Sequence, residues 1–90
     1  MNDTTTQILT ERGKEYGAFQ DLAKLSQILK AIARQHPGWH TLDDDMQEAL
    51  DIIATKTARV LNGNPAHIDS WDDIAGYARL VADRLRGVAR

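Results

Sequence analysis

The chain has 90 residues, no cysteine and a formal net charge of -2 at pH 7. This length suits one domain, residues 1–90, near the lower size at which a chain buries enough apolar surface to fold unaided. Disulfides and thiolate zinc sites are excluded, and the charge balance argues against a nucleic acid polymer as partner. No stretch is typical of a signal peptide or reaches the roughly 20 apolar residues of a membrane span. We therefore expect a cytoplasmic protein without a membrane partner.

Glycine and proline divide the chain into four segments, and each is typical of a helix. The first covers about residues 5–16, with threonines available as caps. The second covers about residues 19–35, places its apolar residues three and four apart, and ends before Pro37. The third begins near residue 41 or 43 and stops at Asn62-Gly63.

The fourth segment begins at Ser70, which with Asp73 three residues later resembles a capping box, and its apolar stripe runs to Val88. Together the four segments predict an all-α fold, a small bundle of about four helices whose core is formed by the last three. The apolar stripes are wide for a chain of this size. They predict a homo-oligomer, with a monomeric bundle as the alternative.

Two cations on the third segment suit a phosphate-bearing ligand. Lys56 and Arg59 lie one turn apart, and they offer a mobile ammonium and a planar guanidinium to phosphate oxygens. The alternative is a solvated helix face, or salt bridges to Asp69 or Asp73. Gly76, inside the fourth segment, costs roughly 1 kcal/mol relative to alanine. We expect a backbone or a ligand to approach closely there.

Aromatic rings accompany these cations. Tyr77 follows Gly76, Tyr16 has Arg12 one turn before it, and Trp71 opens the fourth segment. Rings beside cations suit a purine base and its phosphates. The alternative for either tyrosine is a ring in the core with its hydroxyl at the surface.

Acidic residues form a candidate site for Mg²⁺, which prefers oxygen ligands and often shares carboxylates with a phosphate. The candidates are Glu48, Asp51, Asp69, Asp72 and Asp73. The alternative assigns the last three to the start of a helix and leaves Asp51 in solvent. No histidine pair has metal-binding spacing, and no arrangement predicts nucleophilic catalysis.

Three blocks carry a resemblance to known proteins: Arg12-x-x-x-Tyr16-Gly17, Lys56-x-x-Arg59 and Asp69-Ser-Trp-x-Asp73-Ile-Ala-Gly-Tyr77. Over about residues 8–82 the chain resembles a family of small phage and prophage proteins of unassigned function. Its helical layout is distantly similar to the MazG-like all-α nucleotide pyrophosphatases. That second similarity implies a Mg²⁺-dependent oligomer that splits nucleoside triphosphates into a monophosphate and pyrophosphate.

The metal motif of those enzymes has a Glu-x-x-Glu pair on one helix and a Glu-x-x-Asp pair on the next. The nearest matches here are Glu48-x-x-Asp51 and Asp69-x-x-Asp72, and both depart from the pattern. In another register the second pair reads Asp73-x-x-Gly76. A glycine then stands where the last metal ligand would be.

The resemblance and the incomplete motif favour binding without turnover. We expect a protein that sequesters a nucleotide-derived signal, such as a cyclic nucleotide or a cyclic ADP-ribose-type molecule, in the cytoplasm of an infected bacterium. The predicted ligand-binding residues are Arg12, Tyr16, Lys56, Arg59, Trp71, Asp73, Gly76 and Tyr77. No catalytic residue and no cofactor is assigned.

Two other functions stay open. One is a Mg²⁺-dependent pyrophosphatase, with Glu48, Asp51, Asp69 and Asp72 as metal ligands. The other is a phage adaptor that docks its surplus apolar stripe on a host protein.

Overall fold

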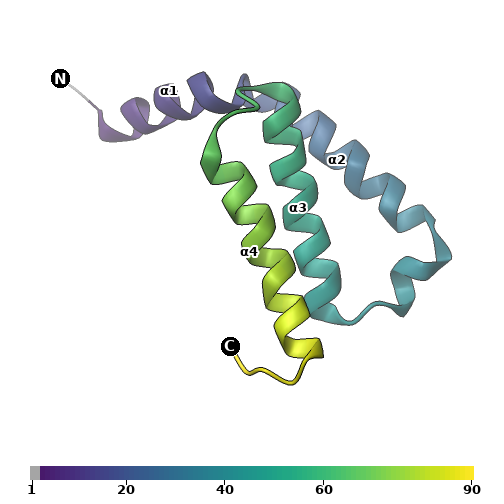
Figure 1. Ribbon diagram of the computed structural model, residues 1–90. Helices are drawn as coiled ribbons and strands as arrows, with labels where there is room; N and C mark the ends of the chain where they lie inside the picture. The colour runs from purple at the N-terminus through teal and green to yellow at the C-terminus, as the bar shows by residue number, and fades with distance from the viewer. Residues whose placement is uncertain (1–2) are drawn as a thin grey trace.

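A computed structural model describes residues 3–90, and it confirms the all-α prediction for that part of the chain. Four α-helices and one short 3-10 helix follow one another: α1 (Thr4–Tyr16), α2 (Phe19–Gln35), η1 (Pro37–Thr41), α3 (Asp44–Asn62) and α4 (Ile68–Leu85). The helix α3 lies between α2 and α4, while α1 projects to one side (Figure 1). Within residues 3–90 no helix combines the length and apolar content needed to cross a membrane.

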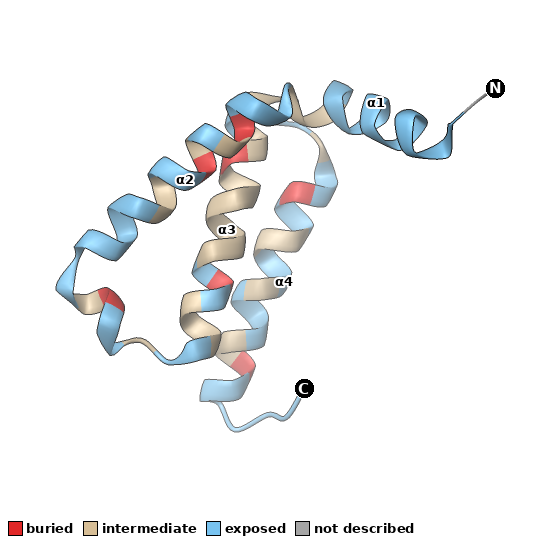
Figure 2. Cartoon of the chain, turned by 180° about the vertical axis from the view of Figure 1, so that it is seen from behind, coloured by how far each residue is buried: buried red, intermediate tan, exposed pale blue. Residues whose placement is uncertain are grey.

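The helix α1 is the least supported part of the fold. None of its residues is buried, and its large apolar side chains Ile8 and Leu9 are 48% and 59% exposed (Figure 2). Its cap is Asp3, which accepts a hydrogen bond from the backbone N–H of Thr5, so the threonine caps predicted from sequence were wrong. Such a short, weakly amphipathic helix gains its stability from contacts outside itself.

The second segment forms the helix predicted for it, residues 19–35, because Gly17 and Pro37 stop it locally at both ends. The following turn is a 3-10 helix that the sequence did not reveal. There His36 accepts a hydrogen bond from the N–H of Gly38, and Trp39 is buried beneath the guanidinium of Arg34, 4.7 Å from the ring centroid. This turn connects α2 to α3 at the ends where the two helices diverge (Figure 1).

The start of α4 differs from the prediction. The helix begins at Ile68 with His67 as its N-cap residue, so Ser70 lies inside the first turn and is buried, with its N–H bonded to the carbonyl of His67. The capping-box reading was therefore wrong. Asp73 is free to reach across to Lys56 on α3.

At the end of α4, one buried carboxylate binds three arginines. Asp83 is 2% exposed and pairs with Arg79 at 2.8 Å, Arg86 at 3.4 Å and Arg90 at 2.8 Å. The helix stops at Leu85, short of the predicted stripe to Val88, and the chain turns back so that the N–H of Val88 bonds to the carbonyl of Asp83. Asp83 thus holds the C-terminal residues against the helix.

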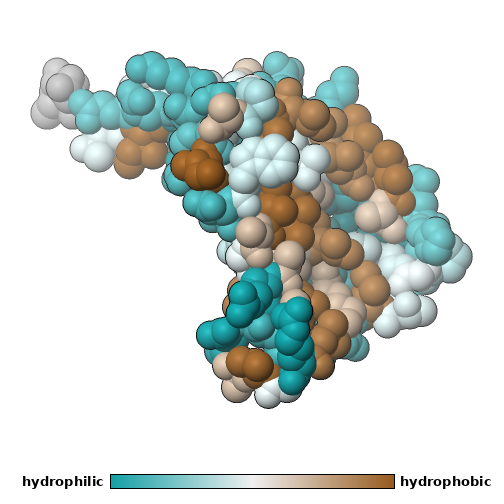
Figure 3. Space-filling model, in the orientation of Figure 1, coloured by the Kyte–Doolittle hydropathy of each residue, from teal (hydrophilic) through white to brown (hydrophobic). Residues whose placement is uncertain are grey.

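The core helices form a layer one helix thick, in place of a closed bundle. The buried apolar residues of the described chain are Leu22, Trp39, Ala49 and Ala58, and no large side chain is fully buried. On one face of the layer, apolar side chains run over α2 and over the seam between α3 and α4 (Figure 3). A domain normally buries such a face against a second layer.

Replacement of Asp83 by asparagine tests whether this carboxylate stabilises the end of α4. The hydrogen bond from Arg79, with a further one from Arg90, lowers the pKa of Asp83. A carboxyl group whose pKa is lowered in the folded state stabilises the fold at pH values above its ordinary pKa of about 3.9. This stabilisation is lost as the pH falls through the lowered pKa. We expect Asp83→Asn to lower the melting temperature at pH 7 and to flatten the decline of stability between about pH 5 and pH 2.

Thermal unfolding followed by circular dichroism across this pH range is the measurement. Asp21→Asn is the matched control, because Asp21 is an exposed carboxylate near the start of α2. We expect only a small change in the control. Equal pH profiles for the wild type and Asp83→Asn would contradict the assignment.

Candidate functional site

The connection between α1 and α2 crosses the end of α3 at two glycines. A Cβ atom on Gly63 would overlap the backbone of Glu15 and Tyr16, and one on Gly17 would overlap the carbonyl of Asn62. Gly17 also has φ = 79°, which side-chain-bearing residues rarely adopt. This contact, which we call the glycine crossing, therefore requires the absence of both side chains.

Hydrogen bonds hold the glycine crossing together. The side-chain amide of Asn62 donates to the carbonyls of Tyr16 (2.9 Å) and Ala18 (3.2 Å), and the N–H of Asn64 donates to the carbonyl of Glu15 (2.6 Å). His67 adds a contact to the Glu15 carboxylate at 3.1 Å. These bonds fix the last turn of α1 against the last turn of α3.

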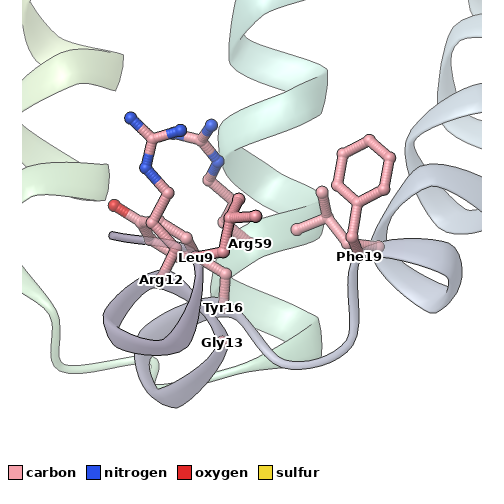
Figure 4. A pocket seen from close by; sticks show the side chains of 7 residues that line it. Leu9, Arg12, Gly13, Tyr16, Phe19 and Arg59 are labelled. Atoms are coloured by element: carbon pink, nitrogen blue, oxygen red, sulfur yellow. The ribbon is translucent and has the colours of Figure 1, made fainter. Parts of the chain in front are cut away.

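A cavity of about 460 Å³ lies beside the glycine crossing (Figure 4). It is lined by Leu9, Arg12, Gly13, Tyr16, Phe19, Leu22 and Arg59. The side chains of Arg12 and Arg59 come from α1 and α3, and their guanidinium groups lie next to each other on one side of the cavity. Phe19, 79% exposed, stands on the other side.

Arg59 packs on an aromatic ring, and its Nε lacks a hydrogen-bond acceptor within the described residues. Its guanidinium carbon lies 4.5 Å from the centroid of the Tyr16 ring, and its buried Nε has no hydrogen-bond partner among residues 3–90. The ring is positioned in turn by an edge contact to His67, 5.5 Å between centroids. A buried donor without an acceptor is costly, so Arg59 retains a hydrogen-bonding capacity that the described chain does not use.

Arg12 and Arg59 differ from the other arginines in having no carboxylate partner within residues 3–90. The arginines that do pair with aspartate are Arg34, Arg79, Arg84, Arg86 and Arg90. The cavity therefore gathers two guanidinium groups that form no ion pair within residues 3–90. Each of the other arginines has an aspartate partner, and Arg79, Arg86 and Arg90 share the single carboxylate of Asp83.

Lys56 and Asp73 belong to a different contact. Their side chains form a salt bridge of 2.8 Å between α3 and α4, and Lys56 is 14% exposed. The hydrogen bond from Lys56 lowers the pKa of Asp73, and the charge of Arg59 adds to this effect. The salt bridge considered from the sequence is therefore present, and Lys56 does not line the cavity.

The remaining predicted ligand-binding residues lie on α4. Gly76 and Tyr77 line a shallow depression with Asp72, Asp73 and Leu80, and a Cβ atom on Gly76 would meet nothing within 4 Å. The close approach expected at Gly76 is therefore absent within a single chain. Trp71 is half exposed and donates its Nε1–H to the carbonyl of Pro65 at 2.7 Å.

Sequence reasoning missed the apolar wall of the cavity. Leu9, Gly13, Phe19 and Leu22 were not predicted as site residues, although Leu9, Arg12 and Tyr16 stand at helical spacing on one side of α1. That spacing was a usable signal. For Phe19, the only signal in the sequence was its position directly after the turn.

The structure does not gather the carboxylates of the pyrophosphatase alternative. Asp51 forms a two-pronged contact with Arg34 (2.8 and 2.6 Å), and Asp69 lies 3.5 Å from His67. Glu48 lines a depression with Tyr77, while Asp72 lies beside Gly76. Within residues 3–90 no group of three or more such side chains is suited to hold a metal ion.

Comparison with known proteins places the chain in a family. A family model described as a domain of unknown function, DUF6378, matches residues 1–85. The chain belongs to the DUF6378 family. No curated protein and no solved structure matches it. The matched part of this DUF6378 chain contains every residue of the cavity and of the glycine crossing.

The glycine crossing can be tested in the DUF6378 chain by adding single methyl groups. We expect Gly63→Ala to lower the free energy of unfolding by about 2–4 kcal/mol, because the new Cβ overlaps backbone that has no room to move. Gly76→Ala is the control, since it adds the same atom in open space inside α4. There we expect a gain of roughly 0.5–1 kcal/mol from helix propensity.

Urea unfolding of the three proteins, followed by circular dichroism, is the measurement. Equal stability of Gly63→Ala and the wild type would show that the crossing is not a tight backbone contact.

Proposed function

We propose that this protein binds and holds a phosphate-bearing, nucleotide-like small molecule in the cavity between α1, α2 and α3, without turning it over. The observation that carries the proposal is the pair Arg12 and Arg59. Both lie on one cavity without a carboxylate partner among residues 3–90, while every other arginine there is paired with aspartate. Unneutralised guanidinium groups are suited to phosphate, which accepts two parallel hydrogen bonds from each.

The rest of the cavity suits the organic part of such a ligand. Leu9 and Phe19 are 59% and 79% exposed, so their apolar surfaces are available to a base or a sugar. Ligand cavities commonly measure about 300–1,000 Å³ and combine apolar walls with a few polar groups. The cavity here, about 460 Å³, has that composition. The unpartnered Nε of Arg59 is itself buried, so a bound phosphate would supply it with an acceptor only after the side chain shifts.

Capture is favoured over hydrolysis by the positions of the carboxylates. Asp51 and Asp73 are occupied by Arg34 and Lys56, and neither lines the cavity. No side chain lining the cavity is a carboxylate or a histidine, the usual groups for activating an attacking water. The proposed role is therefore that of a binding protein.

The ligand class and setting rest on the resemblance to small phage proteins. We propose that the ligand is a cyclic nucleotide or a cyclic ADP-ribose-type immune signal, sequestered in the cytoplasm of an infected bacterium. We also propose that the working molecule is a homo-oligomer, which the exposed apolar face of the core helices supports.

Isothermal titration calorimetry against a panel of cyclic nucleotides and cyclic ADP-ribose-type molecules tests the proposal. We expect at least one compound to bind, and Arg12→Ala and Arg59→Ala each to weaken it about 10- to 100-fold, as loss of a charge-assisted hydrogen bond does. Lys24→Ala is the control, because it removes one positive charge from an exposed position on α2 outside the cavity. We expect it to leave the affinity within about twofold.

The bound compound is then recovered and examined by chromatography. Intact ligand supports capture. No binding by any compound, equal affinity in the two arginine variants and the wild type, or recovery of cleaved ligand alone would overturn the proposal. Mg²⁺-dependent release of pyrophosphate from a nucleoside triphosphate, abolished by Glu48→Gln, would favour the pyrophosphatase alternative instead.

A further inference from the structure

The face of the layer opposite the cavity is apolar across all three core helices. We call it the apolar face and define it by Ile28 and Ile32 on α2, Leu50 and Ile53 on α3, and Ala78 and Val81 on α4. Figure 3 shows the apolar surface continuing from α2 onto the seam of α3 and α4.

The cavity faces the other way. Arg59 is nine residues beyond Leu50 on α3, a rotation of about 900° or two and a half turns, which places the two side chains on opposite sides of the helix. On α2, Gln27, Lys30 and Arg34 line a polar depression with Asp51, whereas Ile28 and Ile32 lie one turn apart on the other side. The two faces are therefore chemically distinct.

The apolar face has a ridge and a groove. Ile28 and Ile32 project from α2 and are 46% and 61% exposed. Between α3 and α4 a cavity of about 290 Å³ has only apolar lining residues, with Ala49 and Ala78 leaving room between the helices. We propose that a second copy of this chain covers the apolar face, with the α2 ridge of each copy in the α3–α4 groove of the other.

The size of the face agrees with this partner. The helix α3 has 19 residues, so it is about 28 Å long at 1.5 Å per residue. Three helices at the usual spacing of about 9 Å would present roughly 750 Å², close to the ~800 Å² that each partner contributes to a stable interface, and the divergence of α2 from α3 widens the face beyond this value (Figure 1). A single foreign helix would cover only part of this width.

Folding also requires a second layer over the apolar face, and a second copy of the chain supplies it. Within residues 3–90 no large side chain is fully buried, so one chain lacks the two-layer core on which a domain of this size depends. The cover must be present wherever the chain folds, and only another copy meets that condition without a further component. In a two-fold dimer the α2 ridge of each copy meets the α3–α4 groove of the other, so one interface contains this contact twice.

The interface is independent of the proposed ligand, so its test uses the free protein. Sedimentation velocity over a wide concentration range is the first measurement. We expect the wild type to have twice the monomer mass and Ile32→Glu to be monomeric, because the new charge would be buried against apolar groups. Leu80→Glu is the matched control. Leu80 is 48% exposed but lies on the cavity side of α4, beside Gly76, and we expect this variant to stay dimeric.

Cross-linking keeps the proposal testable even if Ile32→Glu fails to fold. The chain has no cysteine, so single cysteines can be introduced without background. We expect a short bismaleimide to join copies carrying Ile32→Cys to copies carrying Ala78→Cys, and to leave Leu80→Cys copies single. A monomeric wild type, a folded Ile32→Glu variant that remains dimeric, or cross-linking through position 80 in place of positions 32 and 78 would overturn it.

Discussion

The glycine crossing is the contact on which the proposed site depends. Arg12 and Tyr16 lie on α1, which has no buried residue, and Arg59 lies on α3. The two helices come together because Gly17 and Gly63 let the backbones meet, and because Asn62 satisfies the carbonyls of the turn. Packing of α1 alone would not place a guanidinium over the Tyr16 ring. A backbone contact of this kind fixes direction as well as distance, so the positions of both arginines follow from it.

Ion pairs away from the cavity explain how a chain with a net charge of -2 can have a positively charged cavity. Several acidic residues pair with arginine or lysine along the helices, as in the contacts of Arg84 with Asp43 and Asp45. Those contacts raise the pKa of Arg84 above its usual range and lower that of Asp45. At the cavity no carboxylate takes this role. The attraction for an anion is therefore local and short in range, because salt screens charges beyond about 8–10 Å.

The helices were predictable where their limits are set by neighbouring residues. The limits of α2 follow from Gly17 and Pro37, and both ends were predicted from the sequence. The start of α4 was not, because Ser70 has the local signature of a cap but is drawn into the helix and buried. Asp73 was assigned to the same cap, and its partner proved to be Lys56 on another helix. These errors share a cause: a contact between distant segments outweighs a local preference.

The site shows the same limit. Residue type identified Arg12, Tyr16 and Arg59 as candidates, but the same prediction also included Lys56, Trp71, Asp73, Gly76 and Tyr77, which do not line the cavity. The ring that meets Arg59 is Tyr16, which lies 43 positions away (59 minus 16) and is brought near by the glycine crossing. Two glycines far apart in the sequence carry no pattern that marks them as neighbours. The partners of Arg59 became visible only with the tertiary structure.

The position of α1 also sets how tightly the cavity can hold a ligand. One wall of the cavity is the least buried helix of the described chain, so part of the binding energy must be used to order it. A ligand that contacts Arg12 and Arg59 together spans α1 and α3, and its affinity therefore includes the stability of the contact between them. Under the proposed function, Gly17, Asn62 and Gly63 of the glycine crossing would influence binding in this way although they do not line the cavity. The affinity of the proposed site would then depend on this junction as much as on the charges.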